Sequence, residues 1–265
     1  MKFKDLVLCS DLDGTLLNEN NEIPKVNIEA IEYFKAHGGK FMLATGRLPE
    51  AVIPVIGDIE LDFPCICHNG CSLYDLKRRE YKKCIPLDDG VTEAVKRVLD
   101  ISPTSGVEVM NKDGICVVKS TPITEFHMEY EKITPTYADK IEDVKKPWIK
   151  ILFGQAAEET EKIRHEFLNS SNDQGYTYVR THALYYEIFN KDASKGKALC
   201  QLCNEYKIDL KNVIAIGDNE NDISMLSVAG VGVAVKNSSD IVKEYADIIT
   251  CSNEEGAIAD LISRL

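Results

Sequence analysis

The feature that most constrains this chain is an apolar run near its N-terminus that leads into two aspartates. The run Leu6–Cys9 and one serine are followed by Asp11-Leu12-Asp13-Gly14-Thr15. A run this short, ending in Gly-Thr, predicts a buried strand of a parallel sheet. Side chains alternate along a strand, so Asp11 and Asp13 would share one side of a regular strand. Buried charges need partners, and open α/β sheets bind ligands at the carboxyl ends of their strands, so the pattern predicts a ligand site.

A divalent cation would offset the repulsion between these two carboxylates. Mg²⁺ prefers oxygen ligands, which Asp11 and Asp13 supply. The alternative interpretation of Asp-x-Asp-Gly, taken alone, is a solvated acidic turn, because short motifs recur by chance. The rest of the chain decides between the two interpretations.

Three further segments place polar or charged residues next to a strand-like or helix-like run. They are Thr45-Gly46-Arg47 after the apolar run Phe41–Ala44, Ser194-Lys195-Gly196 at the start of a helical pattern, and Gly217-Asp218-Asn219-Glu220-Asn221-Asp222 after the apolar run Val213–Ile216. Together with the first segment they supply a nucleophile, hydroxyl donors, a cation and further carboxylates. Phosphoryl transfer through an aspartate requires groups of these kinds.

The order and character of these four segments resemble the haloacid dehalogenase (HAD) superfamily of phosphotransferases. The chain length and the position of an insertion resemble its Cof-type sugar-phosphatase branch, and the match runs from residue 5 to about residue 250. The resemblance implies an α/β fold, with a doubly wound, mostly parallel HAD-type sheet and an inserted α+β cap domain. It also implies a phosphatase for small phosphorylated metabolites, either sugar phosphates or phosphorylated cofactors.

The hydrophobic pattern divides the chain in the same way. Strand-like and helix-like runs alternate up to about residue 80 and again over the last part of the chain, which predicts a parallel, doubly wound sheet. Paired strand-like runs between them predict an α+β insertion. We therefore expect a discontinuous catalytic core, residues 1–86 and 190–265, and a cap, residues 87–189. In the resembled family the cap is a lid that closes over the active site and reads the leaving group.

The resemblance gives the two aspartates of the first segment separate roles. Asp11 is the nucleophile that forms an aspartyl-phosphate, and its other oxygen holds Mg²⁺. Asp13 is the general acid that protonates the departing alkoxide and later deprotonates the attacking water. Positioned proton transfer is worth roughly 10²–10⁴ in rate.

The remaining catalytic and metal-binding residues follow from the other segments. Thr45 offers a hydroxyl and an amide to the phosphoryl oxygens, and Lys195 is a point charge for the nucleophile and the phosphate. The expected Mg²⁺ ligands are Asp11, Asp13, Asp218 and Asp222, with Asp218 bound directly and Asp222 through water. The expected substrate-binding or phosphate-binding residues are Leu12, Gly14, Gly46, Arg47, Asn69, Gly70, Glu187 and Asn221.

Two places depart from the family pattern. His68 precedes the family-like Asn69-Gly70, and a lone histidine is more often structural than catalytic. Asn190-Lys191-Asp192-Ala193 stands where the family often has Pro-x-Gly-Val. Asn and Asp tolerate left-handed geometry, so the hinge can survive, but the charge at Asp192 puts the substrate preference in doubt.

Composition excludes some classes of partner. The net charge of −12 argues against a nucleic-acid or anionic-membrane surface, which would need clustered Lys and Arg. No apolar stretch approaches the roughly 20 residues of a membrane span, and the N-terminal apolar run is too short for a signal peptide. We therefore expect a cytoplasmic protein in which the nine cysteines are not devoted to metal or redox chemistry.

Other function classes fit less well. A two-component receiver domain also uses acids, Thr, Lys and Mg²⁺, but its phosphorylated Asp lies on the third strand. A P-loop kinase is excluded because Gly-x-x-x-x-Gly-Lys-Ser/Thr is absent. A hexose phosphomutase of the same superfamily and a non-catalytic sugar-phosphate sensor stay open as alternatives.

Overall fold

The chain divides into two compact units. The computed structural model describes residues 2–168 and 175–265. The first unit combines Met1–Lys82 with Ser194–Leu265, and the second is Lys83–Ala193. The boundaries expected from the sequence, after residue 86 and before residue 190, each differ by four residues from these.

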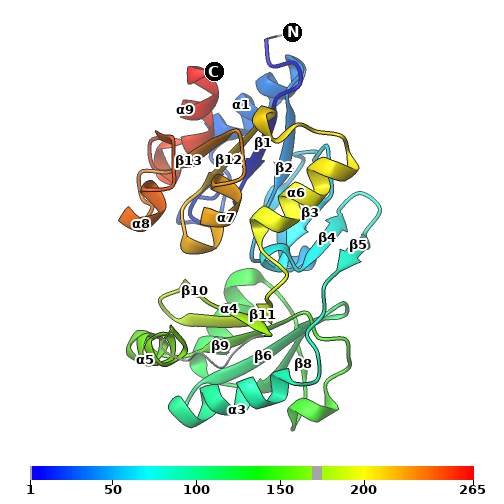
Figure 1. Ribbon diagram of the computed structural model, residues 1–265, viewed down its shortest axis with the longest axis vertical. Coiled ribbons are helices and arrows are strands. Elements are labelled where there is room, and N and C mark those ends of the chain that lie inside the picture. Colours follow the sequence, from blue (N-terminus) through cyan, green and yellow to red (C-terminus); the bar gives the residue numbers. More distant parts are fainter. Residues whose placement is uncertain (1, 169–174) are drawn as a thin grey trace. The chain divides into compact units, whose positions relative to one another are not determined.

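A five-stranded parallel sheet forms the centre of the first unit (Figure 1). Its order is β14-β13-β12-β1-β2, and each neighbouring pair is parallel. The strands are β1 (Val7–Ser10), β2 (Lys40–Leu43), β12 (Val213–Gly217), β13 (Val231–Ala234) and β14 (Ile248–Ile249). The predicted parallel α/β sheet is thereby confirmed. Because β1 lies between β12 and β2, the segments that follow these three strands emerge side by side.

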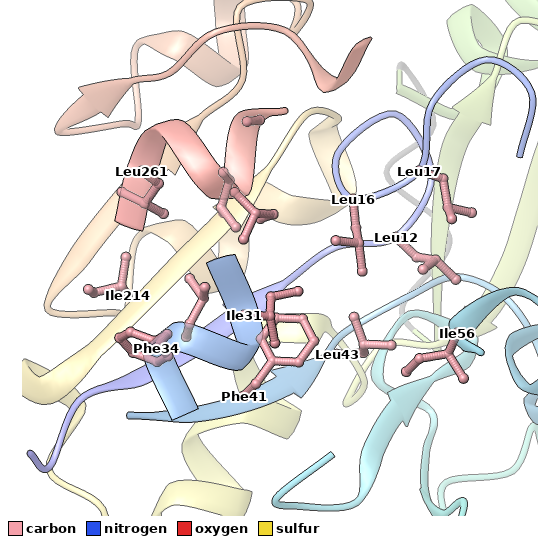
Figure 2. Close-up of a cluster of buried hydrophobic side chains, with 14 of the residues drawn as sticks. Leu12, Leu16, Leu17, Ile31, Phe34, Phe41, Leu43, Ile56, Ile214 and Leu261 are labelled. Atoms are coloured by element: carbon pink, nitrogen blue, oxygen red, sulfur yellow. The ribbon is translucent and has the colours of Figure 1, made fainter. Parts of the chain in front are cut away.

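Helices cover both faces of this sheet. They are α1 (Lys25–Ala36), α2 (Pro49–Ile56), α6 (Lys195–Glu205), α7 (Ile223–Leu226), α8 (Asp240–Lys243) and α9 (Ala257–Arg264). Leu8 of β1 packs in one buried cluster with Phe34 of α1 and Leu261 of α9, part of which is drawn in Figure 2. Its neighbours Val7 and Cys9 face the other cluster, with α6, α7 and α8. Burial on both faces of the sheet explains why the run Leu6–Cys9 is apolar throughout. Burial of each large apolar side chain contributes about 1.5–3 kcal/mol to the free energy of unfolding.

A small three-stranded sheet follows β2 and α2. It consists of β3 (Cys65–Cys67), β4 (Ser72–Asp75) and β5 (Glu80–Cys84), and its strands β3 and β4 are antiparallel. A one-turn 3₁₀ helix, His68–Gly70, reverses the chain between β3 and β4, and all three of its residues have positive φ. Asn69 and Gly70 suit this turn, because Asn and Gly tolerate positive φ better than other residues. Strands β4 and β5 were not predicted, because they are short and rich in polar residues.

The second unit contains a six-stranded mixed sheet in the order β10-β11-β9-β6-β7-β8. The strands are β6 (Gly106–Asn111), β7 (Gly114–Lys119), β8 (Thr136–Tyr137), β9 (Lys150–Gly154), β10 (Tyr176–His182) and β11 (Tyr185–Asn190). Its helices are α3 (Val91–Ile101), α4 (Pro122–Glu131) and α5 (Ala157–Leu168). Side chains of α3 and α5, among them Val95 and Ile163, share a buried cluster with Val109 and Ile151 of the sheet. A membrane span needs a helix of about 20 mostly apolar residues, and the described parts of the chain contain none that qualifies.

Glu108, His127 and Glu131 form a buried cluster of charged side chains in the second unit. The Nδ1 of His127 lies 2.7 Å from Oε2 of Glu108, and its Nε2 lies 3.4 Å from Oε1 of Glu131. Burial alone would lower the pKa of His127, but the two carboxylates outweigh it and raise that pKa to about 10. Burial raises the pKa of Glu108, although His127 acts in the opposite direction. Protonated His127 therefore holds two carboxylates that would otherwise repel each other.

This cluster predicts a pH-dependent stability. The pKa of His127 is about 6.5 in the unfolded chain and about 10 in the folded one, so its contribution is complete below pH 6.5 and disappears as the pH rises through 10. The free energy of unfolding should fall over this range by at most about 1.4 kcal/mol per pH unit. Denaturant titrations of wild type and His127→Gln at several pH values test this, since the variant should lack that part of the decline. The exposed His165→Gln on α5 is the control, and parallel profiles for wild type and His127→Gln would contradict the assignment.

Candidate functional site

The predicted site residues of the first unit converge at the carboxyl end of its parallel sheet. Asp11 follows β1, Thr45 follows β2 and Asp218 follows β12. Ser10 pairs with Leu43 on one side and with Ile216 on the other. The register therefore brings these three strand ends to the same level, at the place where such sheets bind ligands.

A buried lysine joins three of these segments. The Nζ of Lys195 donates to Oδ1 of Asp11 at 2.5 Å and to Oδ1 of Asp222 at 2.6 Å. None of the three side chains is more than 6% exposed. Lys195 is the first residue of α6, whose preceding Ser194 caps the helix by accepting from the backbone N–H of Lys197. The helix start thus delivers the ammonium group to the nucleophile predicted from the sequence.

The carboxylate of Asp222 also holds the loop that follows β12. Its Oδ2 accepts from the backbone N–H groups of Asp218 and Asn219, each at 3.0 Å. Since its Oδ1 accepts from Lys195, both oxygens of Asp222 have partners within the protein. Asp222 therefore fixes the position of Asp218 as well as carrying charge.

Three acids form a group that could hold a metal ion. Asp11, Asp218 and Asp222 offer carboxylate oxygens that all lie within 4.8 Å of one another. Burial, reinforced by the charge of Asp222, raises the pKa of Asp11 to about 7, although Lys195 opposes the shift. Burial and the charges of Asp11 and Asp222 also raise the pKa of Asp218 well above its usual value. One ammonium cannot offset three carboxylates, so the donor set fits Mg²⁺, whose charge would relieve the repulsion.

Asp13 lies outside that group of three. Both of its carboxylate oxygens accept hydrogen bonds from the Arg47 guanidinium. The side chain of Arg47 is only 2% exposed, whereas that of Asp13 is 42% exposed. A role of Asp13 as a metal ligand, and of Arg47 as a direct substrate ligand, stays a prediction from the sequence.

Two glycines are required where the segments approach each other. Gly14 has φ +72°, and a Cβ there would lie 2.6 Å from Oδ2 of Asp218. Gly70 has φ +95°, and a Cβ there would lie 2.2 Å from the carbonyl oxygen of Ser194. Any side chain at either position would displace a segment that carries a site residue.

The predicted Asn69 and Asn221 bond to each other. The Nδ2 of Asn221 donates to Oδ1 of Asn69 at 2.9 Å, and the backbone N–H of Asn69 donates to the carbonyl of Thr45 at 3.0 Å. A Cβ on Gly46 would lie 3.0 Å from the same Oδ1, so Gly46 permits this close approach. Two amide side chains thus join the loops after β3 and β12, and a backbone hydrogen bond joins the loop after β3 to the loop after β2.

The other residues that the sequence singled out have different surroundings. Leu12 has a fully buried side chain in the core, so only its backbone is left for a ligand. Glu187 lies on β11 in the second unit, where its Oε1 accepts from Nζ of Lys150 at 2.9 Å. His68 is buried, with its Nδ1 2.8 Å from Oγ of Ser72. Asp192 is exposed in the turn that ends the second unit.

Two residues that were not predicted from the sequence, Thr15 and Asn21, also hold the site. The hydroxyl of Thr15 donates to Oδ1 of Asp218 at 3.0 Å, and Oδ1 of Asn21 accepts from the Arg47 guanidinium at 2.6 Å. Thr15 could have been found, because it follows the aspartate motif directly. Asn21 gave no signal, since an asparagine in a polar turn is usual.

Known proteins resemble this chain over nearly its whole length. Residues 8–262 match the model of a family described as haloacid dehalogenase-like hydrolase. The putative phosphatase YxeH of Bacillus subtilis is 30% identical over 98% of this chain and 97% of its own. The pyridoxal phosphate phosphatase YbhA of Escherichia coli is 27% identical over 97% of each chain. A crystal structure of a haloacid dehalogenase-like hydrolase from Bacteroides thetaiotaomicron has a TM-score of 0.84 and 25% identity, with 98% of both chains covered.

The group of three acids predicts a coupling between metal and stability. Asp218→Asn removes one of three mutually repelling carboxylates, so without metal the variant should be more stable than wild type. Mg²⁺ at a hundred times its Kd should raise the free energy of unfolding of wild type by about 2.7 kcal/mol and that of the variant far less. Denaturant unfolding in EDTA and in graded Mg²⁺ measures both effects.

The exposed Asp58→Asn is the matched control for Asp218→Asn and should behave as wild type does. Equal Mg²⁺ stabilisation of wild type and Asp218→Asn would show that this carboxylate does not bind the metal.

Proposed function

Because this chain belongs to the haloacid dehalogenase-like hydrolase family, we propose that it is a Mg²⁺-dependent phosphatase. It hydrolyses small phosphorylated metabolites, sugar phosphates or phosphorylated cofactors, through an aspartyl-phosphate. The observation that carries the proposal is the buried Asp11 carboxylate, held by Lys195 beside two further acids at the end of the central strand. The Escherichia coli relative, which is named for pyridoxal phosphate, supports the substrate class.

In the first step a carboxylate oxygen of Asp11 attacks phosphorus. A bond forms between that oxygen and the phosphoryl group, and the bond from phosphorus to the ester oxygen breaks. Asp13 gives a proton to the departing alkoxide. Lys195 reduces the repulsion between Asp11 and the phosphate dianion, because its ammonium lies 2.5 Å from the nucleophile.

In the second step water attacks the aspartyl-phosphate. Asp13, now a carboxylate, takes a proton from this water while the bond from phosphorus to the Asp11 oxygen breaks. The Asp11 carboxylate is regenerated and inorganic phosphate is released. The water-derived oxygen leaves in the phosphate, and the proton lost by Asp13 in the first step is restored. One acid–base group therefore serves both half-reactions.

The residues that would hold Mg²⁺ are Asp11 and Asp218, with Asp222 fixing the loop of Asp218. The ion supplies positive charge against the carboxylates and the phosphoryl oxygens when it is bound. Thr45 has a buried hydroxyl whose oxygen accepts from the backbone N–H of Arg47 at 3.1 Å, so its hydrogen can be donated to a phosphoryl oxygen.

The nucleophile is tested with Asp11→Asn. An amide cannot form the acyl phosphate, so kcat should fall by roughly 10⁴-fold or more while the fold is kept. Phosphate release is measured from p-nitrophenyl phosphate, sugar phosphates and pyridoxal phosphate, each with Mg²⁺ and with EDTA, and Asp58→Asn is the control. Appreciable residual kcat in Asp11→Asn would sink the nucleophile assignment. Turnover that requires a bisphosphate activator would favour the mutase, and binding without turnover would favour the sensor.

The cation is tested with Lys195→Ala. Loss of the ammonium leaves Asp11 and Asp222 to repel the phosphate, so kcat/KM should fall by about 10²-fold or more. Circular dichroism and Mg²⁺ titration establish that the variant is folded. A kcat/KM equal to that of wild type would remove Lys195 from the reaction.

A further inference from the structure

We propose that Arg47 is a positioning residue that acts through Asp13 and does not itself bind the substrate. The inference rests on the proposed role of Asp13 in proton transfer. It replaces the direct substrate role that the sequence predicted for Arg47.

The guanidinium of Arg47 holds the Asp13 carboxylate at two points. Its Nε donates to Oδ2 of Asp13 at 2.8 Å, and its Nη2 donates to Oδ1 at 2.5 Å. Such a bidentate pair fixes the plane of the carboxylate, which a single hydrogen bond would not do. The orientation of Asp13 is therefore set by Arg47.

The guanidinium is itself fixed by two further contacts. Its Nη2 also donates to Oδ1 of Asn21 at 2.6 Å, and its Nη1 donates to the carbonyl of Ala51 at 3.3 Å. Asn21 belongs to a turn in which its N–H donates to the carbonyl of Asn18, and it has φ +61°. Arg47 therefore joins Asp13 both to this turn and to α2.

Burial decides which partner of the pair can meet a ligand. The side chain of Arg47 is 2% exposed and that of Asp13 is 42% exposed. The guanidinium thus lies beneath the carboxylate, with its donors directed at protein acceptors. Asp13 is left as the member of the pair that faces outward.

A positioning role has a particular kinetic consequence. A misplacement of about 1 Å can cost roughly 10²-fold in rate, and here it would affect only the proton-transfer group. An alkyl phosphate needs its leaving alkoxide protonated, whereas p-nitrophenolate leaves without a proton. Hydrolysis of the aspartyl-phosphate also uses Asp13 and is common to both substrates, so the difference between them appears in kcat/KM, which reports the first half-reaction. Loss of the clamp should therefore lower kcat/KM selectively for the alkyl substrate and leave phosphate affinity unchanged.

The experiment compares wild type, Arg47→Lys, Asp13→Asn and the double variant. Lysine keeps the charge but cannot make the two-point contact. With glycerol 2-phosphate, kcat/KM of Arg47→Lys should fall roughly 10²-fold. With p-nitrophenyl phosphate, kcat/KM of the same variant should fall less than about 5-fold. The Ki of inorganic phosphate should stay within about twofold of wild type. In the Asp13→Asn background, Arg47→Lys should cause no additional loss, because it acts through the missing carboxylate.

Two further variants protect the test against loss of the fold. Arg264→Lys is the matched control, because Arg264 makes a similar two-point pair with Asp260 on the surface of α9, and it should leave all constants unchanged. Asn21→Gly suits the positive φ and removes only one anchor of the guanidinium. It should show the same selective fall in kcat/KM for glycerol 2-phosphate, to a smaller extent, even if Arg47→Lys proves unstable.

The possible failures are distinguishable. A raised Ki for phosphate with equal losses of kcat/KM on both substrates, or additive losses of kcat/KM in the double variant, would show that Arg47 binds the substrate directly. Unaltered selectivity in Arg47→Lys and Asn21→Gly, with Asp13→Asn impaired, would overturn this inference alone. Wild-type kcat of Asp13→Asn on glycerol 2-phosphate would instead overturn the proton-transfer role on which the inference rests.

Discussion

The ion pair that the site depends on is the contact of Lys195 with Asp11 and Asp222, at 2.5 and 2.6 Å. It joins the end of β1, the start of α6 and the loop after β12, which are remote in sequence. An unpaired buried charge is strongly unfavourable, so these segments are stable in this arrangement only together. The same contact leaves an excess of negative charge, since Asp218 lies in the same group of acids. The repulsion among these carboxylates therefore lowers the stability of the protein without metal and, at the same time, favours the binding of a cation at this site.

Around this ion pair, hydrogen bonds between neutral side chains and hydrogen bonds from a charged side chain hold the loops of the site together. Asn69 and Asn221 join two loops through amides, and Arg47 joins Asp13 to the turn of Asn21 through a guanidinium. Each link fixes a residue that is attached to a strand end of the parallel sheet. Loops that carry chemistry are thereby held by a rigid scaffold, which is the usual condition for precise catalysis.

The parallel strands and most of the site could be predicted from the sequence alone, because buried apolar runs such as Val213–Ile216 are followed closely by polar or charged site residues such as Asp218. The helix Val91–Ile101 could also have been predicted, since Val91, Val95 and Val98 repeat at helical spacing. The strands Ser72–Asp75 and Glu80–Cys84 could not, because their polar residues leave no periodic signal. Side-chain partners were equally inaccessible. The partnership of Arg47 with Asp13 depends on packing between distant segments, which a residue type does not encode.

The pairing of β1 with β12 has a consequence for how the chain acquires its structure. Val7 pairs with Val213, so the central strand gains one of its two neighbours only after the whole second unit has been synthesised. Until then the edge of β1 that pairs with β12 stays exposed, and Asp11 lacks its ion-pair partner Lys195. Non-local pairing of this kind is slow and leaves intermediates open to aggregation. The second unit, whose contacts lie within one continuous stretch of chain, is free to fold while the first waits for its remaining half.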